Sequence, residues 1–300
     1  MGRVAVIISV DWEGRDIVPD SIDKMESFRD RNPHIPLQHF LNAAYYTKAS
    51  ADPEHITRET LRTVRAGDIQ GLHIHPWKTL MEAADVEVRA EPNIRASGGE
   101  LRIVDGDWGH EIALHHYTPT EISLAIMVSK NILQAQGFSD AVEFRSGAWL
   151  SGTAVTQALV ANGFRVDASA ANRRFLRDRW SESPLFEMLG ELWADVVDTS
   201  QPFQQSVDGG NIWQVPNNGC LADYTTAEDN LEVFMANTAA AGSDNTTQFV
   251  SLGFHQETAL LYLDELERGL RLIEEAASSS EIALEYIASP YAELTSSAAR

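Results

Sequence analysis

Two histidines separated by one apolar residue, His73 and His75 in GLHIHPW, are the first residues whose spacing could do chemistry. On a β-strand, positions i and i+2 point to the same face, so the two imidazoles can meet at one point. Asp11 and Glu13, in SVDWEG, share this spacing. Two neutral imidazoles and a carboxylate can hold a divalent metal and leave positions open for water or a substrate oxygen. The pattern indicates a hydrolytic metal site, although a non-haem iron oxygenase uses the same ligand types.

Apolar runs alternate with helical patterns along most of the chain. We expect strands over residues 4–11, 37–42, 71–75, 142–145, 164–168, 211–215, 248–255 and 283–287. We expect helices over residues 58–65, 121–136, 151–161, 227–240 and 258–276. Repeated alternation of strand and helix predicts an α/β fold with a parallel sheet or barrel.

Two long stretches, residues 78–118 and 169–210, fall outside this alternation and are rich in Gly, Asp, Arg and Trp. We interpret both as loop insertions over the mouth of the site, because α/β barrels place their chemistry at the carboxyl ends of the strands. A chain of 300 residues with 44% apolar residues can bury one large core. We therefore expect a single catalytic domain over residues 1–300.

Polar residues stand at the ends of the expected strands. Asp11, His73, Arg145, Asp167 and His255 each close an apolar run. In a parallel α/β fold these ends converge on one face, which predicts a shared site. Each residue also has a simpler interpretation: Arg145 as a surface cation, Asp167 as the brace of a turn, and His255 as a core histidine.

Five segments resemble, in order, the motifs of the polysaccharide deacetylase family, also called carbohydrate esterase family 4 or the NodB-homology fold: SVDWEG, GLHIHPW, FRSGAW, VDAS and LGFH. The resemblance implies a divergent member with a distorted (β/α) barrel. Three departures stand out. Trp12 separates two acids that the family has side by side, the histidines are two apart and not four, and Gly147 stands where the family has proline.

The resemblance also implies catalytic roles for four of the strand-end residues. Asp11 would be the general base, and Arg145 would pair with it and hold it ionised. His255 would be the acid that protonates the departing amine. Asp167 would orient His255 and raise its pKa.

For the metal, the resemblance implies Glu13, His73 and His75 as ligands. The expected ion is zinc, with cobalt, nickel or iron as alternatives. Because Trp12 is inserted between the two acids, the reverse assignment stays open, with Asp11 as the ligand and Glu13 as the base.

Three tryptophans lie beside these motifs: Trp12, Trp77 and Trp149. Aromatic faces at a cleft stack on sugar rings or clamp acyl groups, so we assign all three to substrate binding. Packing in the core is the alternative for each.

Charge and composition restrict the partners. A net charge of -21 and a pI near 4.7 argue against nucleic acid and anionic membranes. We find neither a signal peptide nor a run long enough to span a bilayer, and the one cysteine, Cys220, cannot form an internal disulfide. We therefore expect a cytoplasmic protein, with no prediction of its oligomeric state.

The expected activity is removal of an acetyl or formyl group from an amino sugar, glycan or glycan precursor. A step in O-antigen, lipopolysaccharide or other surface polysaccharide biosynthesis would fit. Two alternatives remain: a metal-independent hydrolase of the same fold that opens ureides or cyclic amides, and a noncatalytic glycan-binding domain.

Overall fold

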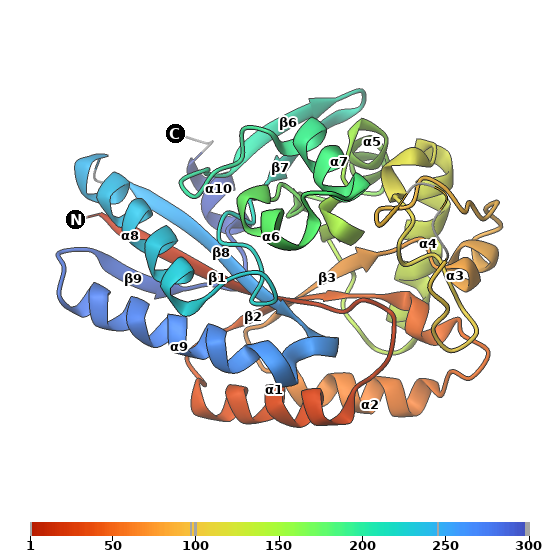
Figure 1. Cartoon of the computed structure of the whole chain (residues 1–300), viewed down its shortest axis with the longest axis horizontal. Helices are drawn as coiled ribbons and strands as arrows, with labels where there is room; N and C mark the ends of the chain where they lie inside the picture. The colour runs from red at the N-terminus through yellow and green to blue at the C-terminus, as the bar shows by residue number, and fades with distance from the viewer. Residues whose placement is uncertain (1, 97, 99–100, 245, 298–300) are drawn as a thin grey trace.

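A nine-stranded sheet curls into an open barrel at the centre of the computed structural model, which describes residues 2–96, 98, 101–244 and 246–297 (Figure 1). The strand order is β6-β7-β5-β4-β3-β2-β1-β8, with β9 paired to β1. All pairings are parallel except β6 with β7. The strands are β1 (Arg3–Asp11), β2 (Leu37–Leu41), β3 (Ile69–Ile74), β4 (Glu143–Ser146), β5 (Val166–Asp167), β6 (Phe203–Val207), β7 (Gly210–Gln214), β8 (Thr247–His255) and β9 (Ala283–Tyr286).

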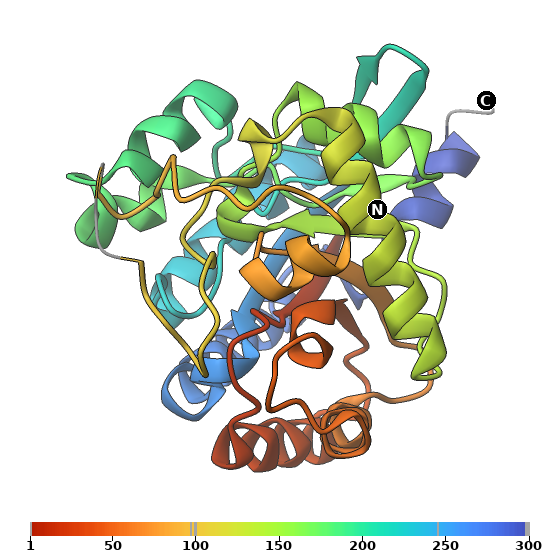
Figure 2. The same cartoon turned by 90° about the vertical axis from the view of Figure 1, so that its right-hand side faces the viewer.

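Among the described residues, six helices that follow strands cover the outside of the sheet (Figures 1 and 2). They are α1 (Pro19–Arg31), α2 (Pro53–Thr63), α4 (Pro119–Ala135), α5 (Thr153–Ala161), α8 (Ala227–Asp244) and α9 (Ala259–Ser278). The others are α3 (Lys78–Ala83), α6 (Arg177–Trp180), α7 (Pro184–Trp193) and α10 (Tyr291–Ser297). Among the described residues, none of these helices has the length and apolar character that crossing a membrane requires.

Strand β1 pairs with three other strands. Its whole length pairs with β8, while its first half pairs with β9 and its second half with β2 on the other side. From Val4 to Asp11 every residue is buried, which explains the continuous apolar run in the sequence. The register sets Asp11 beside His255, so two strand-end candidates are neighbours by backbone pairing.

Residues 216–222, the seam segment, lie between β7 and β8 and complete the barrel. A single parallel bridge joins Leu221 to Gly253. Backbone hydrogen bonds from Gly219 N to the Ser251 carbonyl at 3.1 Å and from Ala222 N to the Gly253 carbonyl at 2.8 Å accompany this bridge. Asn218 adds side-chain bonds: its Nδ2 donates to the Phe249 carbonyl at 2.9 Å, and Ser251 N donates to its Oδ1 at 2.9 Å. Side-chain amides and two backbone hydrogen bonds therefore join this segment to β8 in place of a continuous strand ladder.

The eight expected strands are all present, and together with the curled sheet they confirm the α/β barrel prediction. Strand β5 is shorter than expected, and α2 begins at Pro53 because Asp52 caps it through the backbone N–H of His55. Helix α1 was not predicted, although Ile22, Met25 and Phe28 repeat at helical spacing.

The interpretation of both insertions as loops was wrong in part. The first contains α3, and the second contains α6, α7 and β6. In α7, Leu185, Leu189 and Trp193 repeat on one buried face, which is the amphipathic pattern of a helix. Residues 97, 99 and 100 of the first insertion lie outside the described residues.

Candidate active site

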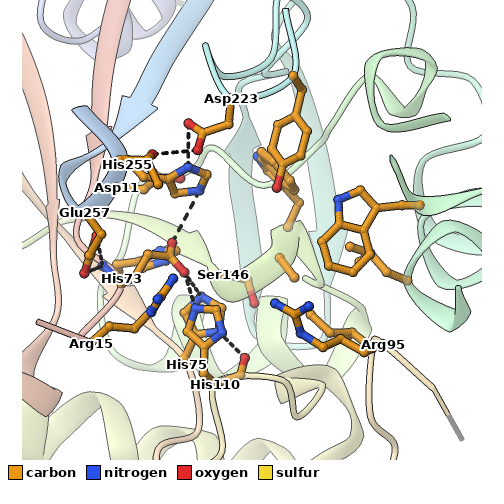
Figure 3. A pocket seen from close by; sticks show the side chains of 18 residues that line it. Asp11, Arg15, His73, His75, Arg95, His110, Ser146, Asp223, His255 and Glu257 are labelled. Carbon is orange, nitrogen blue, oxygen red and sulfur yellow. Dashed lines mark hydrogen bonds and ion pairs between the residues drawn. The ribbon is translucent and has the colours of Figure 1, made fainter. Parts of the chain in front are cut away.

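A pocket with a cavity of about 120 Å³ opens at the carboxyl ends of the central strands (Figure 3). Asp11, His73 and His255 line it from the strand ends. The first insertion adds His110 and the second adds Trp180. Both insertions therefore reach the mouth of the site, as expected from their place in the sequence.

The Glu13 carboxylate is the meeting point of the His73, His75 and His110 imidazoles, and the His255 ring lies farther out, with its Nε2 3.6 Å from Oε1. His73 Nε2 lies 3.2 Å from Oε1, His75 Nε2 lies 2.9 Å from Oε2, and His110 Nε2 also contacts Oε2. Burial alone would raise the pKa of Glu13, but His75, His110 and His73 outweigh it and hold that pKa well below its usual range. Glu13 is thus an ionised carboxylate inside a ring of imidazoles.

Backbone carbonyls fix the tautomers of His73 and His75. The Nδ1 atom of His73 lies 2.8 Å from the Arg145 carbonyl, and that of His75 lies 2.7 Å from the His110 carbonyl. A carbonyl only accepts hydrogen bonds, so each Nδ1 carries a proton and donates. In a neutral ring the Nε2 lone pair then faces the Glu13 oxygens, and His75 Nε2 is buried without a hydrogen-bond partner.

This arrangement fits a divalent cation. Two lone pairs and a carboxylate facing one another are satisfied by a cation between them, and Nδ1–H donation to a carbonyl is the usual support of a metal-bound histidine. Ligand atoms of Glu13, His73 and His75 lie within 4.8 Å of one another. Asp11, Glu13 and His255 meet the same criterion, so geometry alone leaves the alternative carboxylate ligand open.

Close packing against His75 explains why position 147 is a glycine. A β-carbon at Gly147 would lie 2.5 Å from His75 Nδ1, closer than real contacts allow. The His75 ring occupies the space that a proline side chain would need. Two of the sequence departures, the new histidine spacing and Gly147, are therefore one structural adjustment.

Asp11 and Arg145 form a buried ion pair across the barrel. Arg145 Nη1 lies 2.7 Å from Asp11 Oδ1, with side-chain exposures of 0% and 3%. The guanidinium also donates to Ser9 Oγ and to the Ala168 carbonyl, and it lies over the ring of Phe40. The expected pairing is present, and Arg145 is not a surface cation.

Asp167 does not orient His255, so that assignment is corrected. Its carboxylate accepts from Gln214 Nε2 at 2.8 Å, from Ser169 N at 3.1 Å and from Ser151 Oγ. It is fully buried, and it is not among the residues that line the pocket. The simpler interpretation, a brace for the turn after β5, describes its contacts.

Asp223 takes the place expected for Asp167. Because Leu221 pairs with Gly253, the residues two positions later, Asp223 and His255, lie side by side. Their Oδ2 and Nδ1 atoms are 2.9 Å apart. Burial lowers the pKa of His255, but the Asp223 carboxylate more than offsets this and raises it to about 10. His255 is thus an imidazolium in the metal-free protein.

Two of the three tryptophans assigned to substrate are core residues. Trp12 and Trp77 are 0% exposed and do not line the pocket. The Trp12 indole packs beside His39, and Trp77 Nε1 donates to the Glu13 carbonyl at 2.8 Å. Only Trp149 lines the pocket, where it is joined by Trp180, which sequence reasoning missed.

His110 is a further residue that sequence reasoning missed. Its ring stacks on His75 at 4.0 Å with an interplanar angle of 14°. Burial is the main cause that lowers its pKa to about 3, so the ring is neutral and can act as a ligand. Gly109 permits the approach, because it has φ +114 and a β-carbon there would lie 2.2 Å from the Pro76 carbonyl oxygen. In the sequence alone, a Gly-His pair in a long insertion is only a weak indication of a metal ligand.

Glu257 completes the acidic side of the pocket. It accepts hydrogen bonds from the Tyr45 hydroxyl and from Glu13 N. Burial, followed by the charge of Glu13, raises its pKa to about 7. One carboxyl of the site therefore exchanges its proton near neutral pH.

Comparisons with known proteins establish the fold. No family model matches the chain, and no curated protein matches it in sequence. A solved structure assigned as a polysaccharide deacetylase from Mycobacterium smegmatis matches with a TM-score of 0.57 and 11% identity, over 99% of this chain and 92% of that one. The PuuE allantoinase and a protein assigned as a polysaccharide deacetylase from Pseudomonas aeruginosa PAO1 each match with a TM-score of 0.51 and 11% identity, over 95% of this chain and 88% of theirs. The chain has their fold, the distorted (β/α) barrel of the NodB type.

Proposed function

We propose that this protein is a metal-dependent hydrolase that removes an N-acyl group, acetyl or formyl, from an amino sugar in a glycan or glycan precursor. The observation that carries the proposal is the pair of Nδ1-anchored histidines aimed at the Glu13 carboxylate. The shared fold with proteins assigned as polysaccharide deacetylases supports it. Surface polysaccharide biosynthesis in the cytoplasm, O-antigen assembly included, is the setting that we propose.

Glu13, His73 and His75 would hold the ion, zinc in the first instance, with His110 next to them. When bound there, a divalent cation polarises the acyl carbonyl and lowers the pKa of the attacking water. The three imidazoles are neutral in that state, and Trp77 steadies the Glu13 backbone from behind the site.

Two proton-handling groups stand on adjacent strands. Asp11, which pairs with Arg145, accepts the proton of the attacking water. His255, kept protonated by Asp223, donates a proton from Nε2 to the departing amine. The β1–β8 register sets the base and the acid side by side, so both reach the same amide.

A paired assay tests the function. Purified protein with one equivalent of zinc is incubated with N-acetyl and N-formyl amino sugars and with allantoin, and acetate, formate and ureide products are measured with and without a chelator. We expect chelator-sensitive release of acetate or formate. Turnover of allantoin alone, at an unchanged rate in the chelator, would instead establish the metal-independent alternative.

A matched pair of histidine variants tests the site. His73→Ala should lose bound zinc and activity together, because losing one protein ligand weakens the metal site. His34→Ala is the control, since its ring is 57% exposed and pairs with Glu274 at 3.3 Å on the protein surface. Equal zinc content in both variants would show that the ligands are misassigned.

A further inference from the structure

Two arginines, Arg15 and Arg95, line the active-site pocket. Figure 3 shows their side chains on either side of His75 and His110. The chain has 44 acidic and 23 basic residues, so cationic side chains in the pocket run against the overall charge. They have no part in the proton transfers described above.

Three acids that line the pocket, Asp11, Glu13 and Asp223, have partners other than these arginines, whereas Glu257 is near enough to Arg15 for the Arg15 charge to oppose the rise of the Glu257 pKa. Asp11 is paired with Arg145, and Asp223 with His255. Glu13 faces imidazoles on both oxygens. Each of these three carboxylates already has its own cationic or imidazole partner.

Arg15 has a buried hydrogen-bond donor, its Nε, without a partner among the described residues. The Lys48 ammonium donates to the Arg15 carbonyl, which brings a second cation to the same turn. Arg102 adds a third charge: repulsion by Arg15, the largest cause, lowers the pKa of Arg102. The Asp16 carboxylate offsets part of this repulsion, since its charge acts to raise the pKa of both Lys48 and Arg102, and an anionic ligand would offset more of it.

Arg95 is held by both insertions. The backbone N–H of Ile94 donates to the Glu111 carbonyl at 2.8 Å, and Leu185 N donates to the Ile94 carbonyl at 3.0 Å. The Arg95 guanidinium lies over the Trp180 ring at 5.4 Å, and its nearest acid is Glu111, with Nε 3.5 Å from Oε1. At 48% exposure the guanidinium remains accessible to a ligand.

We propose that Arg15 and Arg95 bind an anionic group of the substrate, a phosphate or a carboxylate carried outside the scissile amide. This inference rests on the proposed function. A planar guanidinium donates two parallel hydrogen bonds to either anion, and a pocket partly shielded from water strengthens them. The substrate is then a negatively charged N-acyl amino sugar, either phosphorylated or carrying a uronic-type carboxylate, in preference to a neutral oligosaccharide.

Binding measurements on the zinc-loaded protein test the anion site without turnover. Calorimetry compares glucosamine 1-phosphate, a 2-amino-2-deoxyuronic acid and glucosamine, which share one amino-sugar body. We expect the charged ligands to bind at least about 10-fold more tightly than glucosamine. The stronger of the two charged ligands identifies the source of the anion. Equal binding of all three overturns the proposal, even where hydrolysis of other N-acyl substrates is found.

Variants separate the two arginines from general charge effects. Arg15→Met and Arg95→Met should each weaken binding of the preferred anion by about 10- to 100-fold, with a much smaller change for glucosamine. Arg58→Met, which removes the same charge from an exposed position on α2, should change neither. Equal losses for charged and neutral ligands would show a structural role and overturn the assignment. Failure of all N-acyl hydrolysis, with this charge preference intact, would instead count against the proposed function alone.

Discussion

Replacing Arg145 by methionine should destabilise the protein strongly. The change leaves the Asp11 carboxylate without its cation at 2% exposure. Two charges about 4 Å apart interact by about 4 kcal/mol at an effective dielectric constant of about 20. Breaking a buried pair from one side costs about 3–5 kcal/mol in comparable cases. We therefore expect Arg145→Met to lose about 3–5 kcal/mol of unfolding free energy, equivalent to about 5–8 °C in Tm for a chain of 300 residues.

Urea denaturation of the metal-free protein measures this loss. Lys24→Met is the matched control: Lys24 Nζ lies 2.6 Å from Asp264 Oδ1, but the Asp264 side chain is 69% exposed, so we expect a loss within about 1 kcal/mol. Asp11→Asn, alone and combined with Arg145→Met, completes a double-mutant cycle. If Arg145→Met costs no more than Lys24→Met, or if the cycle shows no coupling, the buried pair does not act as described.

Three further predictions concern the chemistry. Asp11→Asn should keep the metal and lose about two to four orders of magnitude in kcat, whereas Glu13→Gln should lose the metal first. Metal content and rates measured on the same samples distinguish the two roles, and the opposite pattern would exchange them. Asp223→Asn removes the charge that offsets burial, so the pKa of His255 should fall from about 10 and the alkaline limb of the rate profile should move to lower pH. NMR titration of the His255 ring checks this directly, and an unchanged ring pKa would contradict the pairing. His110→Gln should weaken zinc affinity by about 10- to 100-fold in chelator competition, and unchanged affinity would leave His110 as a packing residue.

The strand-end residues could be predicted because parallel strands share one edge. A buried strand reads as a continuous apolar run, as residues 4–10 do, and the first polar residue after it, Asp11, lies at the carboxyl end. The same reasoning located His73, Arg145 and His255. The i, i+2 alternation further implies that Trp12, between Asp11 and Glu13, faces away from the pocket, and the structure buries it there.

The rest of the site depends on contacts that leave little trace in the sequence. Asp223 reaches His255 because the seam segment pairs with β8 at an isolated bridge, and a segment held by isolated bridges has no strand periodicity. His110 reaches Glu13 because Gly109 lets an insertion pass within contact of Pro76. Asp167 ends an apolar run like the others, but hydrogen bonds from Gln214 on β7 and from Ser169 after β5 occupy its carboxylate oxygens.

The contact between the seam segment and β8 is where we expect the barrel to open locally. The β1–β8 ladder opens only when many backbone hydrogen bonds break together, whereas the seam segment is joined to β8 by the backbone bonds of Gly219 and Ala222 and by the side chains of Asn217 and Asn218. We expect the Ser251 amide, which donates to Asn218, to exchange with solvent hydrogen faster than the amides shared between β1 and β8. Asp223 lies just beyond that seam. Local opening there would carry the Asp223 carboxylate away from His255. His255 is then protonated and held in position for proton donation only while the seam segment stays in contact with β8.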